Sequence, residues 1–157
     1  DVNSQPEGCT ADDAARRLFV GVEAEGVYWV EAESGKPTTA HLVAPVDSEI
    51  LAADVEGMDL YLDGDGGYLV VSSQGSFSYA IFERNPPFRY RGSFVVTAGE
   101  TVDSAEETDG LTINSELRTE RFPQGLLVVQ DGFNERPSDN QNFKLVSWQQ
   151  LVLALGL

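Results

Sequence analysis

The sequence has few of the side chains that several common chemistries require. It holds one cysteine, Cys9, and one histidine, His41. A single cysteine excludes an intrachain disulfide and a cysteine-based zinc site, and no nucleophile–histidine–carboxylate triad stands out. Lysine and arginine number 10 against 26 aspartates and glutamates, for a formal net charge of −16. This imbalance argues against a nucleic acid or an anionic membrane surface as partner, because neither would find a basic footprint.

Long apolar segments are also missing. No run approaches the length needed to span a membrane, and the chain starts at Asp1 without a signal-peptide pattern. We therefore expect a mature, processed or truncated chain. The length of 157 residues suggests one domain, and 41% apolar and 23% charged residues are usual for a folded soluble protein. The acidic surplus fits solubility, or cation binding by clustered carboxylates.

The local pattern predicts an all-β fold. Short runs rich in β-branched and aromatic residues alternate with turns that carry Gly, Asp, Asn and Pro. The clearest runs form three pairs, at residues 18–22 with 26–30, 68–71 with 78–82, and 126–129 with 142–146. The only helical candidate is the tail from Trp148 to about Leu155.

A repeat appears when acidic residue–glycine pairs are used as anchors. Glu7-Gly8, Glu56-Gly57 and Asp109-Gly110 each precede a short strand, and the glycines lie 49 and 53 residues apart. About fifty residues and four strands is the size of one β-propeller blade. The sequence therefore predicts three four-stranded blades, near residues 1–48, 49–100 and 101–157.

Three blades do not close a propeller, which typically needs 4–8. Both terminal sheets would expose large apolar faces. We therefore interpret the chain as about half of a six-bladed ring, with another segment supplying the rest.

Repeated acids in successive blades are expected to converge at one mouth of the channel. Glu7, Glu56 and Asp109 hold equivalent places, and Asp54 lies two residues before Glu56. The residues that end or follow the strongest strands, Glu23, Gln74 and Asp131, extend this ring. Clustered carboxylates need a cation to stay ionised together, and Ca²⁺ accepts 6–8 oxygen ligands. A single acidic residue–glycine pair more often forms a turn than a metal site. Because the pair recurs in three repeats, metal binding and turn formation become equally good interpretations of it.

An ordered series of short motifs resembles the β-propeller phytases, the alkaline, calcium-dependent 3-phytase family, and specifically their C-terminal half. The motifs are Asn3-Ser4-Gln5-Pro6-Glu7-Gly8, Ala11-Asp12-Asp13, Asp54-Val55-Glu56-Gly57, Ser72-Ser73-Gln74-Gly75, Ser78-Tyr79-Ala80-Ile81-Phe82, Glu107-Thr108-Asp109-Gly110, Val129-Gln130-Asp131-Gly132 and Asn140-Gln141-Asn142-Phe143-Lys144. They occur in order over nearly the whole chain, to the region of Trp148.

The resemblance implies a six-bladed phosphatase that hydrolyses phytate or calcium phytate with several Ca²⁺ ions, which bind the substrate phosphates and a bridging water that attacks phosphorus. It assigns active-site calcium positions to Glu7, Glu23, Asp54, Glu56, Gln74 and Asp109. It assigns a structural calcium site to Asp103, Asp131 and Asn134. It also implies a secreted or periplasmic protein that needs the N-terminal half of the propeller, where most of the family's phosphate-binding lysines and arginines lie.

Two departures from the family pattern concern the structural calcium site. Phe133 stands where many members carry an acidic ligand, and Ser104 replaces the usual glycine. The alternative from another class is a non-catalytic calcium-binding propeller module. A propeller hydrolase of another type, such as a lactonase, would share the fold but would not need six oxygen-bearing positions at the mouth.

Overall fold

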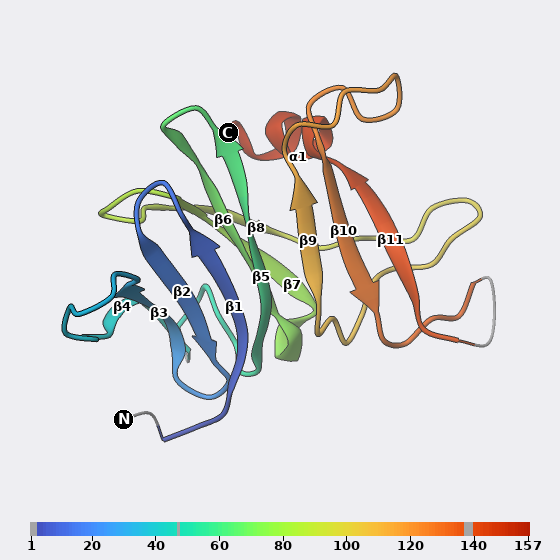
Figure 1. The fold of residues 1–157 in the computed structure, drawn as a ribbon. Helices are drawn as coiled ribbons and strands as arrows, with labels where there is room; N and C mark the ends of the chain where they lie inside the picture. Colours follow the sequence, from blue (N-terminus) through green and yellow to red (C-terminus); the bar gives the residue numbers. More distant parts are fainter. Residues whose placement is uncertain (1–2, 47, 137–139) are drawn as a thin grey trace.

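The computed structural model describes residues 3–46, 48–136 and 140–157, and it confirms the all-β prediction. Three antiparallel sheets follow one another along the chain (Figure 1). The first contains β1 (Pro6–Asp12), β2 (Arg17–Val22), β3 (Gly26–Glu31) and β4 (His41–Pro45). The second contains β5 (Val55–Asp63), β6 (Gly66–Ser73), β7 (Ser78–Glu83) and β8 (Tyr90–Phe94). The third contains β9 (Leu111–Asn114), β10 (Leu126–Asp131) and β11 (Asn142–Ser147).

The apolar pattern of each strand follows the place of its sheet. In β6 the consecutive residues Leu69, Val70 and Val71 are all fully buried, because the second sheet packs on both faces. In β10 only alternate residues, Leu127, Val129 and Asp131, are fully buried, as expected for a sheet with one covered face.

Two hydrophobic cores fill the spaces between the sheets. One joins the first and second sheets and includes Phe19, Leu51 and Phe82. The other joins the second and third sheets with the helix α1 (Trp148–Leu155), and includes Tyr79 and Trp148. The sequence prediction of a helix from Trp148 to about Leu155 is confirmed. No helix among the described residues has the length and apolarity to cross a membrane.

The first strands of the three sheets lie side by side, which makes the arrangement propeller-like. Figure 1 shows β1, β5 and β9 in succession, with the remaining strands of each sheet leading away from them. The Thr10 hydroxyl of β1 donates to the Asp59 carboxylate of β5, and the Thr112 hydroxyl of β9 donates to the same carboxylate. We call β1, β5 and β9 the inner strands.

The predicted four strands are wrong for the third sheet, which has three among the described residues. After β11 the chain enters α1 directly, and the Trp148 ring stacks on Tyr61 of β5 with 3.9 Å between centroids. This contact draws the chain toward the second sheet, so the chain does not continue along the edge of β11. The segment after β11 is therefore a helix packed against the core, where a fourth, outer strand was expected.

The acidic–glycine pairs also differ in detail from the prediction. Glu7-Gly8 and Glu56-Gly57 do not precede their strands but lie within β1 and β5, where the pairing register shifts. Such a shift is a β-bulge, which bends a strand and redirects its side chains. Only Asp109-Gly110 precedes its strand, β9.

Candidate functional site

Close contacts between the inner strands explain two of the three glycines of the repeat, Gly8 and Gly57. A Cβ atom added at Gly8 would stand 2.1 Å from the Glu56 carbonyl oxygen, and one at Gly57 would stand 2.5 Å from the Asp109 carbonyl oxygen. The Gly57 N–H donates to that same Asp109 carbonyl at 2.7 Å. Each glycine therefore lets the acidic residue of the next inner strand come close, which brings the three acids together.

The five carboxylates predicted at the channel mouth gather around Glu56. Burial and the negative charges of Glu7, Asp109, Glu23 and Asp54, in that order, raise the pKa of Glu56 from 4.5 to about 7. Acids 102 positions apart in the chain, from Glu7 to Asp109, thus act on one carboxyl group. We call Glu7, Glu23, Asp54, Glu56, Gln74 and Asp109 the mouth cluster.

Backbone hydrogen bonds hold the mouth cluster on its strand ends. Glu23 follows β2, and its carbonyl accepts a bond from Val55 N–H at 3.1 Å. Gln74 follows β6, and its N–H donates to the Asp54 carbonyl at 2.9 Å. These bonds tie the ends of neighbouring strands together, so the first two sheets present their acids at one place.

Two amide side chains position Asp109. Gln74 Nε2 donates to Asp109 Oδ1 at 2.5 Å, and Gln130 Oε1 accepts from the Asp109 N–H at 2.7 Å. Gln74 was predicted at this site from its place after a strand. Gln130 was not, because the sequence shows only that it precedes Asp131 at the end of β10.

The donor chemistry of the mouth cluster suits a hard cation, since all six side chains offer oxygen atoms. Burial first, and then the negative charges of the neighbouring carboxylates, raise the pKa of Glu56; a divalent cation would offset the part that comes from those charges. Within the described ranges, no three His, Cys, Asp or Glu side chains stand close enough to form a preformed metal centre. The cluster is therefore a convergent set of ligands that would have to draw together around an ion.

The second predicted set, Asp103, Asp131 and Asn134, is also brought together, around an ammonium group. Lys144 Nζ lies 2.5 Å from Asp103 Oδ1, 2.9 Å from Asp131 Oδ2 and 3.0 Å from Asn134 Oδ1. The lysine, Asp103 and Asp131 are all buried. The structure thus separates Asp131 from the mouth ring suggested by the strand-end pattern, and places it here. We call Asp103, Asp131, Asn134 and Lys144 the lysine cluster.

The charges of the lysine cluster stabilise one another. The hydrogen bond from Lys144 holds the pKa of Asp103 well below its usual range, despite the opposing effect of burial. Burial alone would lower the pKa of Lys144, but its bonds and ion pairs with Asp103 and Asp131 outweigh that effect and raise it. The ammonium and the Asp103 carboxylate are therefore both ionised at neutral pH.

Asp59 is a structural link that sequence reasoning missed. Its Oδ1 accepts from the Thr10 hydroxyl at 3.2 Å, and its Oδ2 accepts from the Thr112 hydroxyl at 2.9 Å and from the Ile113 N–H at 2.8 Å. Thr10, Asp59 and Thr112 each lie three positions after the acid of their repeat. That shared offset was the available signal, because equivalent positions of successive inner strands meet in space.

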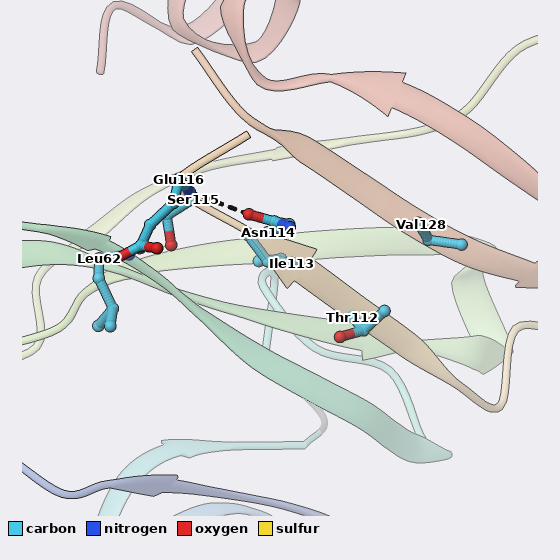
Figure 2. A pocket seen from close by; sticks show the side chains of 7 residues that line it. All are labelled: Leu62, Thr112, Ile113, Asn114, Ser115, Glu116 and Val128. Atoms are coloured by element: carbon cyan, nitrogen blue, oxygen red, sulfur yellow. Dashed lines mark hydrogen bonds between the residues drawn. The ribbon is translucent and has the colours of Figure 1, made fainter. Parts of the chain in front are cut away.

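An open pocket lined by residues of β5, β9, β10 and the turn after β9 includes no predicted site residue. Figure 2 shows its seven lining residues, which are Leu62, Thr112, Ile113, Asn114, Ser115, Glu116 and Val128. The Glu116 N–H donates to Asn114 Oδ1 across one side of it. With one carboxylate and otherwise neutral or apolar side chains, this pocket lacks the convergent acids of the mouth cluster.

Fold and site together define a propeller-like β-protein whose inner strands collect carboxylates at a common mouth. The family model described as Phytase matches residues 1–157, so the chain belongs to the phytase family. A curated relative, 3-phytase from Bacillus subtilis (strain 168), is 39% identical over 158 residues, which cover 99% of this chain and 41% of the relative. The predicted resemblance is confirmed, and the chain spans less than half the length of that relative.

Proposed function

We propose that this chain is the C-terminal half of a calcium-dependent phosphomonoesterase that releases phosphate from phytate. The observation that carries the proposal is the convergence of Glu7, Glu23, Asp54 and Asp109 on Glu56. Membership of the phytase family and the similarity to a protein named 3-phytase support the reaction class.

The mouth cluster would hold the metal. Phytate and this chain are both strongly anionic, so direct contact between them would be repulsive. Calcium, when bound, supplies positive charge for phosphoryl oxygens and lowers the pKa of a bound water. The chain itself contributes carboxylate ligands on bulged strands, and Gln74 and Gln130 fix the orientation of Asp109.

The partner we propose is the N-terminal half of the same propeller. Gly110 repeats the position of Gly8 and Gly57, yet a Cβ atom added there would meet nothing within 4 Å. In the first two repeats this space is taken by the carbonyl of the next acidic residue. The open space beside Gly110 therefore supports a further inner strand next to β9, as in a six-bladed ring.

A secreted or periplasmic location fits the same proposal, because free calcium is abundant outside the cytoplasm. A non-catalytic calcium-binding module is the competing function. It would use the same mouth cluster without turning over substrate.

The test is phosphate release from calcium phytate by the completed propeller, with and without a chelator. Glu56→Gln should abolish most of the activity. Glu31→Gln is the control and should not, because Glu31 is an exposed acid at the end of β3 that lies away from Glu23 and the mouth cluster. Activity that survives chelation would reject the metal mechanism. Stabilisation by calcium without any phosphate release would instead favour the binding module.

A further inference from the structure

The lysine cluster resembles a metal site in which a side-chain ammonium group takes the place of the metal ion. Lys144 Nζ lies within 3.0 Å of one oxygen from each of Asp103, Asp131 and Asn134. These are the three side chains that the family resemblance assigns to a structural calcium ion. The lysine is itself 6% exposed, so its ammonium group is withdrawn from water at the centre of the set.

The remaining carboxylate oxygens are occupied by backbone donors. Asp103 Oδ2 accepts hydrogen bonds from the N–H groups of Glu135 and Arg136, and Asp131 Oδ1 accepts one from the Glu106 N–H at 3.1 Å. Asp131 Oδ2 lies 2.9 Å from the Lys144 ammonium group and forms an ion pair with it, but it has no hydrogen-bond partner. The ammonium group thus offsets one of the two negative charges, and backbone N–H groups bond Asp103 Oδ2 and Asp131 Oδ1, the two carboxylate oxygens that Lys144 does not contact.

The ligands left over do not suit calcium. Phe133, at the position where the family often has an acid, carries no oxygen and is 62% exposed. Asn142 Oδ1 is buried without a hydrogen-bond partner, but one neutral amide oxygen does not replace a carboxylate. Calcium takes 6–8 oxygens and is bound more tightly as the number of charged ligands rises. The donor set present here therefore fits a single ammonium group better than a divalent ion.

We propose that Lys144 is the resident cation of this cluster, and that it binds the loop before β9 to β10 and β11 without calcium. In this chain, calcium dependence is then confined to the mouth cluster. The inference does not depend on the phosphatase activity proposed above.

The first test is amide hydrogen exchange in calcium and in chelator. The amides of Glu106, Glu135 and Arg136 report the cluster, because they donate to its carboxylates. We expect their protection to be the same in both conditions. Loss of protection at these amides in chelator, while the amides of β6 stay protected, would overturn the proposal.

The second test is calcium stoichiometry by equilibrium dialysis, which works even if chelation unfolds the protein. The double variant F133E/K144Q should bind one more calcium ion than the unchanged protein, because it restores an acid and removes the ammonium group. Equal stoichiometry would overturn the proposal. K36Q removes the other lysine, which is exposed, and should leave both readouts unchanged.

A single Lys144→Gln variant measures the strength of the device. The reporter amides should exchange on the order of a hundredfold faster, because one partner of a buried ion pair is lost. Unchanged exchange would show that the lysine does not hold the cluster. Glu56→Gln should weaken calcium binding at the mouth without affecting these amides, so failure of the proposed function and failure of this inference are distinguishable.

Discussion

The glycines of the repeat give a sharp test of the inner-strand packing, by Gly57→Ala against Gly110→Ala. The two positions are equivalent in the repeat but differ in their surroundings. A Cβ atom at Gly57 would lie 2.5 Å from the Asp109 carbonyl oxygen and 2.9 Å from Gly110 Cα, whereas one at Gly110 would meet nothing within 4 Å. Gly57→Ala should therefore separate β5 from β9, and Gly110→Ala should not.

The cost follows from the kind of atom that is met. Both close neighbours of the Gly57 Cβ position are backbone atoms, so no side chain can rotate away. Overpacking of this kind costs about 1–3 kcal/mol, which lowers the melting temperature by roughly 2–4 °C per kcal/mol in a chain of this size. Gly110→Ala should be neutral or stabilise by up to about 1 kcal/mol, because alanine reduces the freedom of the unfolded chain.

Thermal unfolding of both variants in chelator is the assay, followed by calcium titration. Gly57→Ala should also weaken calcium binding, because the displaced backbone carries Glu56 and Asp109. If the two variants melt at the same temperature, the packing argument is wrong. In the completed propeller the order should change, since Gly110→Ala would then collide with the additional inner strand.

Two other substitutions test charged groups in the structure. Arg84→Met should destabilise the chain by about 3–5 kcal/mol, because it removes the ion-pair partner of the buried Asp12 carboxylate, which lies 2.5 Å from Arg84 Nη2. Urea unfolding measures this loss, most of which should be recovered in R84M/D12L. A loss below about 1 kcal/mol in the single variant would contradict the reasoning. The pKa of Glu56 is raised from 4.5 to about 7, so in chelator the folded chain binds more protons than the unfolded one, and stability should fall as pH rises through that interval. After allowance for solvent screening, Glu56→Gln should remove about 1–2 kcal/mol of this loss of stability. Melting temperatures from about pH 4.5 to 8.5 measure it. If the melting temperature of the variant depends on pH as that of the unchanged chain does, Glu56 is not the titrating group.

The strands and the repeat could be predicted because both depend on short-range patterns. The apolar run of β6 and the alternation in β10 report burial directly, and acidic–glycine pairs mark the bends in β1 and β5. The helix at Trp148 was predicted, but its effect on the third sheet was not. That effect depends on a stacking contact with Tyr61, 87 positions earlier in the chain.

The residues of the candidate sites also differ in how far the sequence could predict them. Most members of the mouth cluster were predicted because they hold equivalent places in successive repeats, either before a glycine or at the end of a strong strand, and Asp54 because it lies two residues before Glu56. Lys144 lies in one of the motifs that resemble the family but was assigned to no site, because its role depends on Asp103, 41 positions away, and on Asp131 in the neighbouring strand. At the position of Asp59 the other two repeats carry threonine. The repeat therefore indicated the position but not the hydrogen bonds by which Asp59 joins the inner strands.

The two acidic clusters solve one electrostatic problem in opposite ways. At the mouth, burial and the charges of four neighbouring carboxylates raise the pKa of Glu56, and no basic side chain among the described residues contributes to that shift. In the lysine cluster, Lys144 neutralises one of two buried carboxylates and backbone N–H groups hold the rest. A cluster left repulsive can take up and exchange a cation, whereas a cluster with an internal ammonium group cannot exchange it. The first arrangement therefore suits binding of a metal and its anionic substrate, and the second suits permanent attachment of the third sheet.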